Sequence, residues 1–160
     1  LLLPLPQTNQ ADSPRIIIVR CENADPSKIS FVTVVKTSLM ILDILFNEDD
    51  NFVVAGQTGF INLNGMTLRH AVQITPTISK KILRYLQDCY PSRPKEMFFI
   101  NTPTFFESLY NIARPILKAK VLDRFYIYNG KNIENIHQHI SLSVLPKEYG
   151  GEGSSLDELT

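Results

Sequence analysis

The sequence has little of what marks extracellular, membrane-spanning or nucleic-acid-binding proteins. Two cysteines, Cys21 and Cys89, are too few for a disulfide-stabilised fold, so we expect two reduced, buried thiols. The absence of any Asn-x-Ser/Thr sequence favours the cytoplasm, and no apolar run reaches the roughly 18 residues that span a bilayer. Acidic and basic residues balance at 16 each, so no overall positive charge draws the chain to nucleic acid.

Catalytic and nucleotide-binding motifs are also missing. Gly56–Gly59 lacks the third glycine and the following helix that a phosphate-binding loop needs, and no Gly-x-Ser-x-Gly sequence occurs. The histidines, His70, His137 and His139, lack the further ligands at close spacing that a metal site needs. Asp43 is a single carboxylate in an apolar segment, without a partner acid or base. We therefore expect a protein that is not an enzyme and that holds no metal and no cofactor.

What is present is the composition of one soluble domain, with 44% hydrophobic and 20% charged residues in a chain of 160. Residues 1–14, rich in Pro, Gln and Asn, predict an extended N-terminal segment, and residues 15–152 predict the folded domain. The Gly, Ser and acidic residues of 153–160 predict a flexible C-terminal tail. Because the chain does not begin with Met, we expect it to be part of a longer protein.

Strands and helices alternate along the chain. Apolar runs predict strands over residues 15–20, 51–61, 97–100 and 124–128, and helical spacing predicts helices over 26–46, 75–90, 103–117 and 133–140. Asp25-Pro26, Thr75-Pro76 and Thr102-Pro103 each combine a helix-capping residue with a proline suited to the first turn. We interpret the acidic residues 48–50 as a solvated loop. The alternation predicts an α/β fold with a mostly parallel sheet.

Two groups of residues allow either a functional or a plain structural interpretation. Four basic residues precede predicted strands and could meet at one sheet edge to hold a phosphorylated headgroup, or could be scattered solvated cations: Arg93, Lys95, Lys120 and Arg124. The helix predicted over 103–117 has an apolar face too wide for one stripe, formed by Phe105, Phe106, Leu109, Ile112, Ala113 and Ile116. Such a helix is either deeply buried or a lid that covers a cavity and touches a membrane.

Four stretches in order give the chain a resemblance to a known family. They are Arg15–Pro26, Leu68–Pro76 (similar to "LSHALQFTP"), Phe99–Pro103 (similar to "FINxP") and Leu145–Gly151 (similar to "LPxEYGG"). With these motifs the chain resembles the CRAL-TRIO family of lipid-binding domains, in the branch of alpha-tocopherol transfer protein and retinaldehyde-binding protein, especially its insect members.

The resemblance implies a three-layer α/β/α sandwich with a mostly parallel, mixed sheet of about five strands that encloses a lipid pocket. Matched positions imply pocket walls from Leu39, Asp43, Ile61, Leu68, Ile74, Ile82, Leu86, Tyr90 and Met97. They also imply that the apolar helix over 103–117 is the lid, and that Arg93, Lys95, Lys120 and Arg124 bind phosphatidylinositol bisphosphates.

The function implied is transfer of one small hydrophobic ligand, such as a tocopherol, retinoid, carotenoid, sterol or phospholipid, between membranes. We expect a cytoplasmic monomer that associates transiently with phosphoinositide-containing membranes and binds no nucleic acid. One alternative is a membrane or protein adaptor with a collapsed pocket. Another is an enzyme acting on a small apolar substrate, which the absence of an acid, base and nucleophile disfavours.

Two departures from the family pattern qualify the resemblance. The family usually has Asp before Leu-x-Gly, whereas Asn62 precedes Leu63 here, so a charge is lost. The family's N-terminal three-helix module has no counterpart in these 160 residues, which removes some of the phosphoinositide contacts and support that the module would supply.

Overall fold

The computed structural model describes residues 1–6, 12–128 and 133–160. One mixed sheet contains β1 (Leu2–Pro4), β2 (Arg15–Arg20), β3 (Gln57–Asn62), β4 (Pro94–Ile100) and β5 (Phe125–Tyr128), in that spatial order. Strands β2 to β5 are parallel, and β1 pairs antiparallel with β2 at the edge. The predicted α/β class and five-stranded sheet are therefore confirmed.

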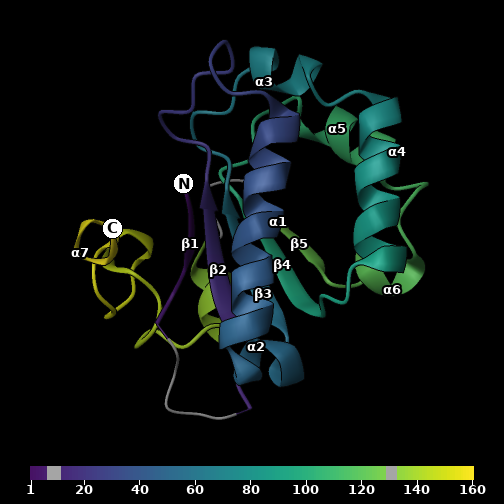
Figure 1. Ribbon diagram of the computed structural model, residues 1–160. Coiled ribbons are helices and arrows are strands. Elements are labelled where there is room, and N and C mark those ends of the chain that lie inside the picture. Colours follow the sequence, from purple (N-terminus) through teal and green to yellow (C-terminus); the bar gives the residue numbers. More distant parts are fainter. Residues whose placement is uncertain (7–11, 129–132) are drawn as a thin grey trace.

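Helices connect each parallel strand to the next. They are α1 (Phe31–Glu48), α2 (Asp50–Ala55), α3 (Leu68–Val72), α4 (Pro76–Arg84) with the π-helical turn η1 (Tyr85–Cys89), α5 (Phe106–Ala113) and α6 (Ala119–Leu122). Because strand order follows sequence order and parallel crossovers are right-handed, all three connections lie on one face of the sheet. The other face is covered by the 3₁₀ helices η2 (Ile133–Gln138) and η3 (Lys147–Tyr149) and by α7 (Leu156–Leu159) (Figure 1).

The face covered by the C-terminal segment is densely packed. Phe60 of β3 and Phe98 of β4 are 0% exposed, and Ile18 of β2, which lies beside Phe60 in the sheet, is equally buried. Leu145 and Leu156 from that layer are also almost completely buried. This side of the sheet therefore forms the main core of the molecule.

The strand predicted over residues 51–61 is wrong in its first half, because residues 50–55 form α2. Asp49 explains the error: its carboxylate accepts from the amide of Phe52 at 3.1 Å and so caps the helix. The same carboxylate accepts from Nε of Arg15 at 2.7 Å and is only 7% exposed, so the predicted solvated loop is wrong at Asp49, although Glu48 and Asp50 are exposed. An aromatic and β-branched sequence thus forms a helix because its cap is held by a buried ion pair.

Helix starts differ from the cap-then-proline predictions at two of three places. Thr75 caps α4 by accepting from the amide of Ile78, as predicted. Asp25 instead caps a turn through Ser27, and α1 begins later, at the cap Ser30. The turn after Thr102-Pro103 delays α5 to Phe106.

Both ends of the described chain pack against the sheet. Leu5, just after β1, is buried, so the predicted N-terminal segment includes an edge strand. The predicted flexible tail contains α7, in which Ser155 and Glu158 cap each other and Leu156 is 1% exposed. Among the helices of the described residues, none has the length and apolarity needed to cross a membrane.

Candidate functional site

The helix-covered side of the sheet is apolar but loosely packed. Successive residues of a strand point to opposite faces, so Ile61 of β3 and Met97 and Phe99 of β4 face the helices. All three are only half-buried, although their strand neighbours Phe60 and Phe98 are fully buried on the other face. Leu39 of α1, Ile82 of α4 and Leu86 of η1 are half-buried as well. We call these six residues, Leu39, Ile61, Ile82, Leu86, Met97 and Phe99, the helix-side apolar face.

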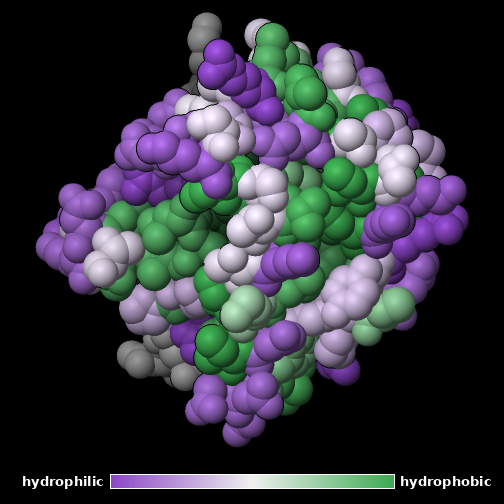
Figure 2. Space-filling model, turned by 45° about the horizontal axis from the view of Figure 1, so that its top comes forward, coloured by the Kyte–Doolittle hydropathy of each residue, from purple (hydrophilic) through white to green (hydrophobic). Residues whose placement is uncertain are grey.

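Gly59 has no side chain, so its neighbours can close over it in the middle of this face. A β-carbon at Gly59 would lie 2.7 Å from the sulfur of Met97 and 3.3 Å from Cδ1 of Ile61. The two side chains therefore lean over the glycine, and any larger residue would displace them. Figure 2 shows apolar side chains, in green, extending across this side of the molecule between polar margins.

One polar pair borders the helix-side apolar face. The hydroxyl of Tyr90, which follows η1, donates to Oδ1 of Asp43 in α1 at 2.7 Å and so joins the two connections. The Tyr90 ring is 8% exposed and packs edge-on against Phe46 with centroids 5.5 Å apart. Burial, together with the hydrogen bond to Asp43, raises the pKa of Tyr90, so the hydroxyl keeps its proton and remains the donor.

The predicted pocket residues do not all belong together. Leu39, Asp43, Ile61, Ile82, Leu86, Tyr90 and Met97 come from the sheet and the helices on one side, as described above. Ile74, between α3 and α4, is half-buried. Leu68 on α3 is 64% exposed and does not line an enclosed wall, because the short α3 turns its inner residues, His70 and Ala71, toward the protein.

The predicted lid residues are neither deeply buried nor fully exposed. Phe105, Phe106, Leu109, Ile112, Ala113 and Ile116 are all half-buried. The ring of Phe106 packs on Phe99 of the sheet with centroids 5.4 Å apart. The predicted lid helix thus covers one end of the helix-side apolar face and completes it with aromatic side chains.

The C-terminal end of the predicted lid segment is hydrogen-bonded to η1. The side chain of Gln87 donates to the carbonyl of Ile116 at 3.3 Å and accepts from the amide of Lys118 at 2.8 Å. The ammonium of Lys118 also pairs with Asp88 at 2.6 Å on the surface. We call these three interactions the Gln87–Lys118 contact.

The predicted basic residues lie at the amino-terminal edge of β4 and β5. Arg124, just before β5, donates through Nη1 to the carbonyl of Pro94, so it lies beside the segment that carries Arg93 and Lys95. Lys120 is one turn earlier, on α6, and is exposed like Arg93 and Lys95. The pairing of β4 and β5 thus places Arg124 next to the segment that carries Arg93 and Lys95. Lys120 is near Arg124 in the sequence.

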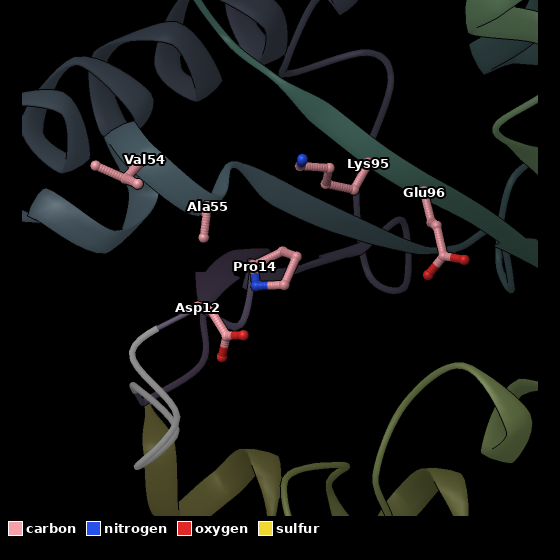
Figure 3. Close-up of a pocket in the computed structure, with 6 residues that line it drawn as sticks. All are labelled: Asp12, Pro14, Val54, Ala55, Lys95 and Glu96. Atoms are coloured by element: carbon pink, nitrogen blue, oxygen red, sulfur yellow. The ribbon is translucent and has the colours of Figure 1, made fainter.

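A hollow of about 600 Å³ opens at the same edge. Its lining consists of Asp12, Pro14, Val54, Ala55, Lys95 and Glu96 (Figure 3). Lys95 extends toward Val54 of α2, whereas the Glu96 carboxylate points away from it and contacts Nδ1 of His139 at 2.8 Å. The ammonium of Lys95 is therefore not paired with its sequence neighbour.

Sequence reasoning did not find the polar junction at the opposite edge. Asn62 at the end of β3 accepts from the amide of Asn64 at 3.0 Å and from the side chain of Asn101 at 3.1 Å. It donates to the hydroxyl of Tyr149 at 3.3 Å and is buried. The two Phe-Ile-Asn sequences that end β3 and β4 are the signal for this junction. The chain near this junction also needs a glycine at position 151, because a β-carbon there would lie only 1.8 Å from the carbonyl oxygen of Leu145.

The sequence motifs thus meet in space as one structural unit, and residues 5–151 match the sequence pattern described as the CRAL/TRIO domain. The chain belongs to the CRAL/TRIO domain family. Clavesin-1 of Xenopus laevis is 32% identical to this CRAL/TRIO domain over 137 residues, which cover 86% of this chain and 41% of that protein. Alpha-tocopherol transfer protein-like of Homo sapiens is 30% identical over 159 residues, which cover 99% of this chain and 46% of that protein.

The chain therefore spans less than half the length of these curated relatives of the CRAL/TRIO domain. Among solved structures, the crystal structure of Sfh5 superposes with a TM-score of 0.61 at 17% identity, covering 99% of this chain and 57% of that one. The shared fold agrees with the predicted α/β/α sandwich.

Two of the three histidines of the CRAL/TRIO domain, His70 and His139, make structural hydrogen bonds. Nδ1 of His70 accepts from the amide of Thr67, and Nε2 faces the carbonyl of Ala24 at 3.0 Å, which joins α3 to the loop before α1. His139 contacts Glu96, as described above. Across the described parts of the chain, no three His, Cys, Asp or Glu residues gather in the way a metal site requires.

Proposed function

We propose that this CRAL/TRIO domain binds a small hydrophobic lipid on the helix-side apolar face and transfers it between membranes. The observation that carries the proposal is the unequal burial of the two faces of one sheet. Phe60 and Phe98 are fully buried, whereas Ile61, Met97 and Phe99 are not. A ligand that removes about 400 Å² of this apolar surface from water would gain on the order of 10 kcal/mol before ordering costs.

The name of one relative supports the same function. Alpha-tocopherol transfer protein-like is named for transfer of a hydrophobic molecule, and it covers almost all of this chain. In the proposed cycle the lid helix moves away from Phe99, the ligand exchanges, and the lid closes again. The ligands compatible with the face remain those predicted from the sequence, and the proposed carrier is a cytoplasmic monomer.

The first experiment identifies what the protein carries. Lipid extracted from the purified protein is analysed by mass spectrometry, and transfer of the extracted lipid between donor and acceptor vesicles is then measured. We expect close to one hydrophobic molecule per chain and a rate that rises with protein concentration. If the purified protein contains no lipid and transfers none between vesicles, the result would instead favour the adaptor with a collapsed pocket.

We further propose that the basic residues dock the carrier on membranes containing phosphatidylinositol bisphosphate. Arg93, Lys95 and Lys120 are exposed at the edge from which the lid segment returns to the sheet through α6. Basic residues near an anionic surface contribute about 1 kcal/mol each, so three of them amount to about a hundredfold in affinity.

A triple variant, Arg93→Ala, Lys95→Ala and Lys120→Ala, tests the docking proposal. Arg124 is left in place because its guanidinium holds the carbonyl of Pro94. Binding to vesicles with and without the bisphosphate lipid is measured by sedimentation. The matched control removes three exposed cations of α4, Lys80, Lys81 and Arg84. Equal binding by the two variants would contradict the docking proposal.

A further inference from the structure

The Asp43–Tyr90 pair borders the helix-side apolar face, and its hydrogen bonds have a direction. The single proton of the Tyr90 hydroxyl is directed to Oδ1 of Asp43 at 2.7 Å, and the carbonyl of Leu39 is a more distant acceptor at 3.5 Å. Within the described residues, Oδ2 of Asp43 makes no hydrogen bond to another group. The pair therefore offers acceptors and no donor to a molecule that lies beside it.

The position of the pair makes it reachable from the helix-side apolar face. Tyr90 packs in one cluster with Leu39 and Leu86, which belong to that face. Asp43 lies one turn after Leu39 on α1 and is exposed, so its second oxygen is accessible. A lipid lying along Leu39 and Leu86 would bring one end to the carboxylate.

We infer that the lipid carried by this domain bears a hydroxyl group, which donates a hydrogen bond to Asp43. The inference rests on the proposed function, because it assumes that the helix-side apolar face holds a lipid. An ester, aldehyde or ether offers only acceptors, so it supplies no hydrogen bond to Oδ2 of Asp43. A phosphate group would place like charge beside Asp43, so neutral alcohols such as sterols, chromanols and retinols fit better than phospholipids.

The test compares each alcohol with its own methyl ether, which keeps the skeleton and removes the donor. Retinol, α-tocopherol and cholesterol and their methyl ethers are titrated into the lipid-free protein, and dissociation constants are measured by fluorescence or competition. For at least one skeleton we expect the alcohol to bind about tenfold more tightly, the effect of one hydrogen bond to a partly exposed charged acceptor.

Variants assign the preference to the carboxylate. Asp43→Asn presents an amide donor, so the alcohol preference should disappear or reverse. Tyr90→Phe keeps the ring and the carboxylate, so the preference should persist. Glu48→Gln removes the same charge from the end of the same helix, where it is exposed, and should change nothing.

Two kinds of outcome would overturn the inference, and they are distinguishable. Equal affinity of every alcohol and its ether, or an alcohol preference that persists in Asp43→Asn, would overturn this inference while leaving lipid binding intact. No binding of any alcohol or ether would overturn the proposed function together with the inference.

Discussion

At the scale of single residues, the position before Leu63 shows how a family departure is accommodated. Asn62 uses its oxygen to accept from Asn64 and Asn101 and its amide to donate to the hydroxyl of Tyr149. An aspartate could accept from all three groups if the tyrosine turned its proton toward it. The lost charge therefore leaves the junction connected, because the tyrosine hydroxyl can act as donor or acceptor.

Replacing Asn62 by Leu should destabilise the protein. The change leaves the Asn64 amide and the buried Tyr149 hydroxyl without their partner, so the free energy of unfolding should fall by about 2 kcal/mol or more. Urea denaturation measures it. The control Asn62→Asp should remain within about 1 kcal/mol of the natural protein, and a loss as large as that of the Leu variant would contradict the proposed junction.

Gly59 should limit how much lipid the domain accepts. Gly59→Ile places a branched side chain where Met97 and Ile61 now lean together, so lipid recovered per chain should fall at least severalfold. Gly59→Ala adds one methyl group against the flexible end of Met97 and should retain most of the lipid. Mass spectrometry of extracted lipid measures both, and equal occupancy in the two variants would place the ligand elsewhere.

At the scale of elements, the sequence predicts correctly the helices and strands whose local sequence preference agrees with their tertiary contacts. Thr75 and Pro76 start α4 because the cap and the proline act within one turn. Phe52-Val53-Val54 has strand propensity but forms α2, because the cap at Asp49 depends on Arg15, which is 34 residues away. The run Met97–Ile100 is apolar at every position, so no alternation in the sequence reveals that Met97 and Phe99 belong to the candidate site.

The Gln87–Lys118 contact should control how fast the lid helix opens. Gln87→Ala removes the two hydrogen bonds that reach Ile116 and Lys118, worth about 1 kcal/mol each, so ligand release should become at least about tenfold faster. Lys118→Ala removes only an exposed ion pair, worth about 0.2–1 kcal/mol, and should speed release less than about fivefold. Stopped-flow transfer to acceptor vesicles measures both rates, with Lys80→Ala as the control, and equal rates for all variants would exclude this role.

At the scale of the whole molecule, the two sides of the sheet should respond differently to a ligand. Amide hydrogen exchange of the lipid-free and lipid-loaded protein measures this directly. We expect lipid to slow exchange in α4, η1 and α5 and to leave η3 and α7 nearly unchanged, because those helices cover the face that is already fully packed. Protection spread evenly over both sides would contradict a ligand on the helix-side apolar face.

The order of the layers along the chain also has a consequence for synthesis. The cover over Phe60 and Phe98 comes from Leu145, Tyr149 and Leu156, which are translated after every strand of the sheet. While a ribosome makes the chain from its N-terminus, the most apolar surface of the future core stays open until these last residues emerge. The nascent sheet therefore exposes this apolar face during this interval. A nascent chain whose strands have all emerged, but whose residues from 145 onward have not, would still expose this core.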